Sequence, residues 1–90
     1  MTGRLALSKQ GHDKGKVYLI IKEEGNSLFL SDGAKRGLLA PKKKNKRHIQ
    51  PIHGGFEETE LESFFENPAW ADEQIREKIA EFNRGRDPEQ

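Results

Sequence analysis

The apolar residues in the first half of this chain occur in short runs, and this limits the folds that the chain can adopt. The longest run, Val17–Ile21, is rich in β-branched and aromatic residues, which is typical of a central strand, and it is too short for a helix. Apolar residues alternate with other residues over 4–8, and three consecutive apolar residues occupy 28–30. Each of these two segments predicts a further strand. Glycine-containing segments at 11–15 and 24–26 predict tight turns, the second of which closes a hairpin.

Two more strands are predicted in the same half. Residues 38–40 are expected to form a short edge strand that ends at Pro41, because proline cannot donate to a ladder. Residues 47–50 are expected to form the last strand, which the following proline and glycines would end. A sheet of about five short strands leaves the fewest exposed edges when it closes into a barrel. We therefore expect a mainly β fold, a small SH3-like barrel of about five strands over residues 1–53, with a flat three-stranded meander as the alternative.

Residues 54–90 have the pattern of an α-helical extension that follows the barrel. Thr59–Glu62 matches a capping box, which predicts the start of a short helix. A second helix is predicted from Asn67–Pro68, an N-cap followed by proline, to Gly85. One face of this second helix is apolar and consists of Ala71, Ile75, Ile79 and Phe82.

The two parts of the chain carry opposite charge. Residues 1–50 contain 12 Lys and Arg against 4 Asp and Glu, and residues 51–90 contain 4 against 11. The balances of +8 and −7 give the net charge of +1. Charge that serves only solubility is usually mixed in sign. The separation therefore points to a polyanion-binding part and an acidic part, with a solubilising surface as the alternative.

The densest positive charge lies at 42–47, where five of six consecutive residues are Lys or Arg. Adjacent like charges repel, and phosphates neutralise them with release of counterions. We expect a nucleic-acid contact loop here; a solvated loop, a nuclear-import signal and an anionic membrane patch are the alternatives. Together with residues of the other predicted loops, the expected RNA contacts are Arg4, Lys9, His12, Lys14, Gly15, Lys16, Lys35, Arg36, Lys42, Lys43, Lys44, Lys46, Arg47 and His48.

The segment Gly11–Lys16 differs from a nucleotide-hydrolysing loop. A Walker loop has four residues between its glycines and leads into a helix, whereas here three intervene and a strand is predicted to follow. The glycines serve a tight turn, which either brings backbone amides to a phosphate or is purely structural. No catalytic residue, metal site, cofactor or small-molecule substrate is expected, because cysteine is absent and the three histidines lack zinc spacing.

Four ordered segments of the first 52 residues resemble a KOW motif: Gly3–Leu7, Gly11–Val17, Ile20–Ile21 and Leu30–Gly33. The resemblance is to the KOW-type large-subunit ribosomal proteins of eukaryotes and archaea and to small stand-alone bacterial KOW proteins. It implies an SH3-like barrel and binding to RNA, chiefly ribosomal RNA. Gly11 stands where the motif has its defining glycine. Positions at or beside the loop that such proteins lay against RNA are matched by Arg4, Lys14, Gly15 and Lys16.

The resemblance does not cover the acidic segment, where ribosomal relatives usually carry basic tails. We therefore expect a non-enzymatic RNA-binding accessory factor that associates with large-subunit ribosomal RNA. No apolar segment approaches the length of a membrane span, and a cytoplasmic location is expected. The alternative is a transcription- or assembly-linked adaptor, whose protein partner would contact Trp70, Ile75, Ile79 and Phe82. A third hypothesis is that the acidic helices cover the basic face and compete with RNA.

Overall fold

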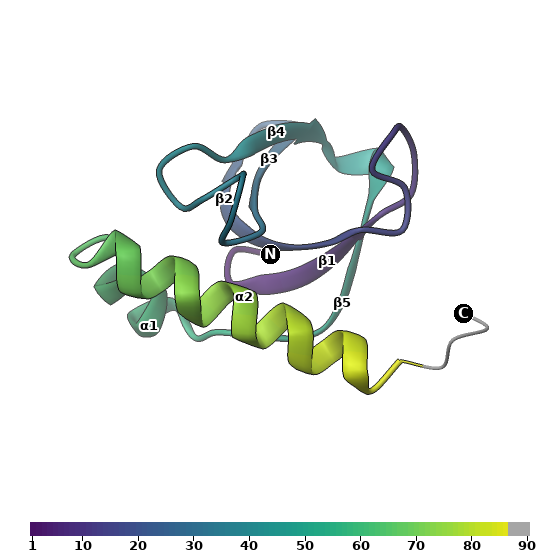
Figure 1. The fold of residues 1–90 in the computed structure, drawn as a ribbon. Helices are drawn as coiled ribbons and strands as arrows, with labels where there is room; N and C mark the ends of the chain where they lie inside the picture. The colour runs from purple at the N-terminus through teal and green to yellow at the C-terminus, as the bar shows by residue number, and fades with distance from the viewer. Residues whose placement is uncertain (87–90) are drawn as a thin grey trace.

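A five-stranded antiparallel sheet forms the first part of the chain in the computed structural model, which describes residues 1–86 (Figure 1). The strands are β1 (Arg4–Ser8), β2 (Val17–Glu24), β3 (Ser27–Ser31), β4 (Lys42–Asn45) and β5 (Ile49–Gly55). The spatial order is β4-β3-β2-β1-β5, and the sheet curves into a barrel-like shape that no ladder between β4 and β5 closes within the described residues. A 3-10 turn, η1 (Lys46–His48), connects these two edge strands.

The predicted fold class, mainly β with C-terminal helices, is confirmed. The β2–β3 hairpin forms as predicted, with Leu19 opposite Ser31 and Gly25 at a φ of +57° in its turn. Two of the predicted strands differ from the structure. Residues 38–40 are a turn, and the fourth strand is the lysine run itself, which pairs with β3 so that Lys43 lies opposite Phe29.

The last strand also differs from the prediction. Residues 46–48 form η1, and β5 begins at Ile49 and continues through Pro51 to Gly55. Pro51 lies opposite Ala6 of β1. Because β5 pairs on one side only, the missing amide hydrogen of a proline can face away from the ladder without breaking it.

Two helices follow, α1 (Glu58–Phe64) and α2 (Pro68–Arg84). The capping box of α1 lies two residues earlier than predicted and consists of Glu57 and Glu60, with the Glu57 amide donating to Glu60 at 3.1 Å. For α2 the predicted ends are confirmed. The Asn67 side chain accepts from the Trp70 amide, and Gly85 is the C-cap. No helix among residues 1–86 combines the length and apolarity needed to cross a membrane.

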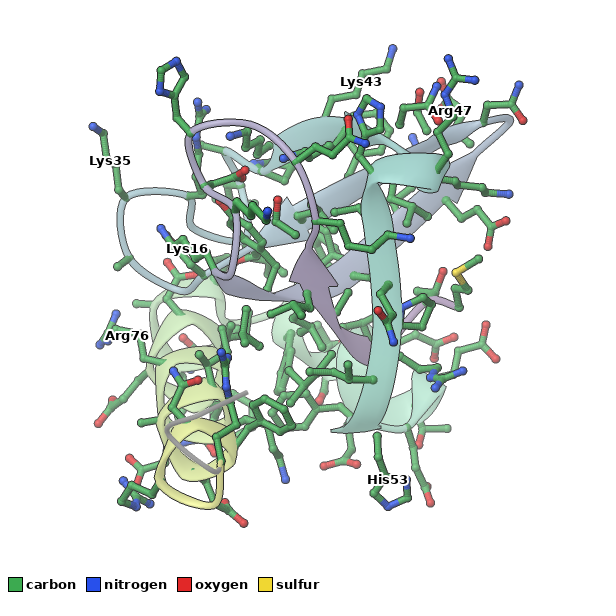
Figure 2. The ribbon with its side chains drawn as sticks, turned by 90° about the vertical axis from the view of Figure 1, so that its right-hand side faces the viewer. Lys16, Lys35, Lys43, Arg47, His53 and Arg76 are labelled. Carbon is green, nitrogen blue, oxygen red and sulfur yellow. The ribbon has the colours of Figure 1, made fainter. Side chains whose placement is uncertain are left out.

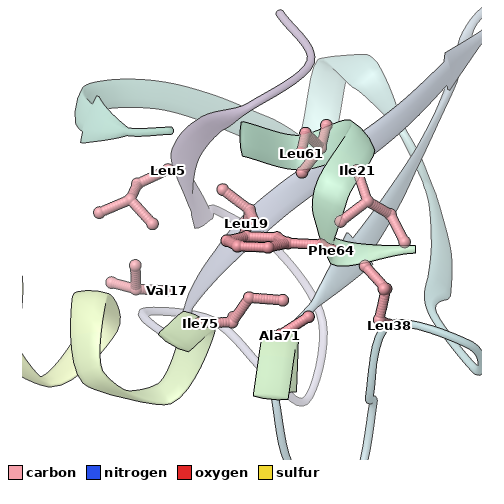
Figure 3. Close-up of a cluster of buried hydrophobic side chains, with 9 residues drawn as sticks. All are labelled: Leu5, Val17, Leu19, Ile21, Leu38, Leu61, Phe64, Ala71 and Ile75. Carbon is pink, nitrogen blue, oxygen red and sulfur yellow. The ribbon is translucent and has the colours of Figure 1, made fainter. Parts of the chain in front are cut away.

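The strand β2 is buried on both faces, which explains its unbroken apolar run. One face packs against the helices in a cluster formed by Leu5, Val17, Leu19, Ile21, Leu38, Leu61, Phe64, Ala71 and Ile75, and Figure 3 shows Phe64 lying among side chains of β2 and α2. The other face points into the barrel and packs with Ala6, Tyr18, Ile20, Leu28, Leu30 and Ile49. The helices are therefore an integral part of the core and share it with the sheet.

The loop between β3 and β4 is held by α2. The Leu38 amide donates to the Asp72 carboxylate at 2.7 Å, and the Arg76 guanidinium donates to the Gly33 carbonyl. Gly33 has a φ of +73°, and a Cβ there would lie 2.9 Å from the Arg76 amide nitrogen. Only glycine allows the loop to approach the helix backbone this closely. These contacts determine where the loop cations Lys35 and Arg36 are presented.

Candidate nucleic-acid interface

Asp13, in the loop between β1 and β2, is the centre of a polar cluster. Its Oδ1 atom accepts hydrogen bonds from the Ser8 hydroxyl at 2.8 Å and from the Lys44 ammonium at 2.5 Å. Its Oδ2 atom accepts from the Tyr18 hydroxyl at 2.8 Å and from the Lys42 ammonium at 2.9 Å. The side chains of Asp13 and Lys44 are only 10% and 11% exposed. One carboxylate thus forms ion pairs with two lysines of the same strand.

The contacts of Asp13 determine its ionisation. Burial by itself would raise the pKa of this carboxyl, but hydrogen bonds from Lys44, Lys42, Tyr18 and Ser8 outweigh burial and hold the pKa well below its usual range. Burial raises the pKa of the Tyr18 hydroxyl, and the hydrogen bond to Asp13 and its negative charge raise it further. The cluster therefore contains a charged carboxylate and a neutral phenol at physiological pH.

Two further cations of the basic half are also paired. Lys16 forms an ion pair with Asp32 at 2.8 Å, and Lys46 forms one with Glu23. Burial would raise the pKa of Asp32, but the hydrogen bond from Lys16 and two backbone amides lower it. The hydrogen bond from Lys46 likewise lowers the pKa of Glu23. Among the expected RNA contacts, the cations with an ion-pair partner are Lys16, Lys42, Lys44 and Lys46.

The expected contact loop at 42–47 is a strand followed by a 3-10 turn, and this changes the role of its lysines. Side chains alternate between the two faces of a strand. Lys42 and Lys44 share the face that meets Asp13, whereas Lys43 points to the opposite face, 5.9 Å from the centre of the Phe29 ring. The expectation that all lysines of this run face an RNA together is therefore corrected, because alternate residues of the strand face opposite ways.

Besides Arg4 on β1, six exposed cations of the basic half have no ion-pair partner within residues 1–86, and we call these six the cationic surface: Lys9, Lys14, Lys35, Arg36, Lys43 and Arg47. They come from neighbouring segments. The β1–β2 loop is joined to β4 through Asp13 and to η1 through the Lys9 amide, which donates to the His48 carbonyl at 2.8 Å. The β3–β4 loop leads directly into β4.

The acidic helices do not cover this surface. Figure 2 shows Lys35, Lys43 and Arg47 pointing into solvent in the upper part of the view, whereas Arg76 of α2 lies lower, and Lys9 and Lys14 adjoin the C-terminal end of α2. The two helices carry seven Asp and Glu and three Lys and Arg. The exposed cations are thus open to solvent although some of them adjoin α2, and the hypothesis that the acidic helices compete with RNA for the basic face stays a prediction.

The glycine loop at 11–15 is a structural turn. Gly11 and Gly15 have φ values of +93° and +89°, which favour glycine. The amides of Lys14, Gly15 and Lys16 donate to carbonyls of Gly11, Ser8 and Asp13 at 3.2, 2.8 and 2.9 Å. These three donors are therefore already used, so at residues 14–16 side chains rather than backbone amides are available to a phosphate.

The remaining expected contacts are on β1, in the β1–β2 loop and in η1. Arg4, on β1, is exposed, and its guanidinium donates to the Ile52 carbonyl at 3.4 Å. His12 is exposed in the β1–β2 loop, and His48 is half-buried in η1. Within residues 1–86, no three His, Cys, Asp or Glu side chains are grouped so that they could hold a metal ion.

The four residues expected to contact a protein partner have different environments. Ile75 is fully buried, and Ile79 and Phe82 are half-buried against the same cluster, so this stripe packs on the sheet. Trp70 is 43% exposed and lies edge-on to Phe64 with ring centroids 5.4 Å apart. The free apolar stripe that an adaptor would need is therefore used by the core.

Sequence reasoning missed Asp13 as the partner of the lysine run. The run Lys42–Asn45 has no alternation of polar and apolar residues that would have indicated a strand. The identity of the opposing residue was not available locally, because Asp13 is 31 residues from Lys44. A comparison with protein-family models finds no match for this chain, and a comparison with curated proteins finds none either.

Proposed function

We propose that this chain is a non-enzymatic RNA-binding module that associates with the ribosome through large-subunit ribosomal RNA. The observation that carries the proposal is the cationic surface, whose six exposed side chains lack ion-pair partners within residues 1–86. Unpaired cations on neighbouring loops are suited to phosphates, which bind them with counterion release. The resemblance to KOW proteins supports RNA, and ribosomal RNA in particular, as the polyanion.

The arrangement favours recognition of RNA shape over base sequence. Contacts to phosphates position a protein on nucleic acid but carry no sequence information. Lys and Arg side chains on two loops, on β4 and on η1 are suited to the phosphates of a folded RNA. If the six cations each neutralise a phosphate, the logarithm of affinity should fall against the logarithm of salt concentration with a slope of about −4 to −5.

The test is co-sedimentation of the protein with ribosomes and their separated subunits at low and high salt. We expect recovery with the large subunit that decreases as salt rises. The double variant Lys43→Gln, Arg47→Gln should reduce this recovery. A control with the same charge change, Lys78→Gln, Arg84→Gln on α2, should leave it near the wild-type level.

Three outcomes have distinct meanings. Recovery independent of salt, or equal losses in both double variants, would show that the cationic surface is not the contact. Absence from ribosomal fractions together with salt-dependent binding to a structured RNA would restrict the proposal to RNA other than the ribosome's. Absence of both would overturn it, and the exposed Trp70 would then be the first residue to test for an adaptor function.

A further inference from the structure

A recess lies between β1, β5 and the C-terminal end of α2. Its volume is about 520 Å³, which is in the range of sites that hold a small organic ligand. Apolar contact area comes from Leu7, Ile52 and Phe82, which are half-buried and pack with one side against the core. The positive charge comes from Lys9, Lys14 and Arg86. Among residues 1–86, no aspartate or glutamate lines the recess.

We propose that this recess holds one unpaired nucleotide of the bound RNA. The base lies against Phe82 and its apolar neighbours, and the adjoining phosphates contact Lys9 and Lys14. The inference rests on the proposed function and adds to it the feature of the RNA that is recognised, a nucleotide outside a duplex. It assigns a role to an apolar site that phosphate contacts alone do not use.

The chemistry of the recess selects an amphipathic anion. An apolar peptide or a lipid tail would leave three cations without a counter-charge, and a bare phosphate would leave the apolar side chains uncovered. A nucleotide satisfies both, because it joins a flat π-face to an anionic group. The Arg86 guanidinium carbon lies 5.7 Å from the centre of the Phe82 ring. Aromatic rings and guanidinium planes are the groups on which proteins stack unpaired bases.

The position of the recess makes it continuous with the cationic surface. Lys9 and Lys14 belong to both, so an RNA that crosses the β1–β2 loop passes the opening. The two ends of this loop are held by the hydrogen bonds from the Lys9 amide to His48 and from the Gly15 amide to Ser8, each 2.8 Å long. The opposite wall is held by the packing of α2 on the sheet. The site is thus formed by rigid elements before any ligand binds.

The test compares two RNA hairpins that differ by one bulged nucleotide, in fluorescence polarisation at a fixed salt concentration. The wild-type protein should bind the bulged hairpin about tenfold more tightly than the fully paired one, as expected for one stacked base. Phe82→Leu keeps an apolar side chain and removes the ring, so it should abolish most of this preference and leave affinity for the paired hairpin unchanged. Phe56→Leu is the control, because Phe56 is also half-buried against the core but does not line the recess.

Equal binding of the two hairpins by the wild-type protein, or a preference that survives Phe82→Leu, would overturn the inference while the proposed function stands. Failure to bind either hairpin would count against the proposed function, and the recess is then tested by itself. Uridine 5′-monophosphate should shift the ring resonances of Phe82 together with the amide resonances of Lys14 and Gly15, whereas ribose 5-phosphate, which lacks the base, should leave the Phe82 ring resonances unchanged. Identical shifts with both compounds, or shifts with neither, would overturn the nucleotide site.

Discussion

The Asp13 carboxylate and the Lys44 ammonium form an ion pair of 2.5 Å that joins the β1–β2 loop to the edge strand β4 across 31 residues of sequence. Lys42, on the same face of β4, reaches the other oxygen of Asp13 at 2.9 Å. Two lysines of the most basic segment therefore stabilise the fold and are not free for a ligand.

Asp13→Asn should destabilise the protein by about 2–4 kcal/mol, because it leaves the buried ammonium of Lys44 without its counter-charge. The measurement is the free energy of unfolding in urea. Glu24→Gln is the control, since the ion pair between Glu24 and Lys22 has side chains that are 61% exposed and should contribute less than about 1 kcal/mol. Equal effects of the two substitutions would show that the Asp13 cluster does not stabilise the fold.

The stabilisation from Asp13 should be lost in acid. Its pKa in the folded protein is lowered from an ordinary value of 3.8. Because the pKa of Asp13 is lower in the folded than in the unfolded protein, the ionised carboxylate stabilises the fold fully when the pH is above the unfolded-state pKa. This contribution to the free energy of unfolding is lost progressively as the pH falls below about 4. The difference in unfolding free energy between wild type and Asp13→Asn should therefore be largest near neutral pH and shrink between about pH 5 and pH 2.

Urea unfolding of both proteins across this pH range provides the test. The groups that face Asp13 are Ser8, Tyr18, Lys42 and Lys44, and the raised pKa of Tyr18 keeps its hydroxyl neutral over this range. Asp32 and Glu23 also have lowered pKa values, but they are present in both proteins and cancel in the difference. A difference that is constant with pH would contradict the prediction.

Lys43 and Lys44 are neighbours in sequence with opposite roles, and glutamine substitutions should separate them. Lys43→Gln removes an exposed charge, so it should reduce the salt slope of RNA binding by about 1 and change stability by less than about 0.5 kcal/mol. Lys44→Gln weakens the Asp13 cluster and should cost about 1–3 kcal/mol of stability. The same two measurements, urea unfolding and a salt titration of RNA affinity, apply to both variants. An exchange of these phenotypes would mean that the faces of β4 are assigned the wrong way round.

Gly33→Ala should be more damaging than Gly25→Ala, although both glycines have positive φ values of +73° and +57°. At Gly33 a Cβ would meet the α2 backbone, 2.9 Å from the Arg76 amide, whereas nothing lies within 4 Å of one at Gly25. We expect a cost of about 3 kcal/mol at Gly33 and about 1 kcal/mol at Gly25, measured by thermal unfolding. Similar costs would show that the loop does not need its close approach to α2.

Local patterns predicted the elements that depend on local chemistry. The buried run at 17–21, the hairpin turn at Gly25 and the ends of α2 at Asn67 and Gly85 were all predicted correctly. The predictions were wrong where pairing between strands outweighs the strand propensity of the local sequence. The lysine run has low strand propensity, yet it becomes an edge strand because β3 offers it a ladder, and lysine is well tolerated at an edge.

The sequence by itself determined a mainly β domain with an amphipathic C-terminal helix and opposite charges in its two parts, because periodicity and composition are properties of short segments. Only the tertiary structure decided which cations are free, since an ion pair such as Asp13–Lys44 depends on the distance between remote residues in space. Only the tertiary structure, too, brought Phe82 beside Lys9 and Lys14. The fold therefore leaves only some of the cations of the basic half available to a ligand and fixes their positions.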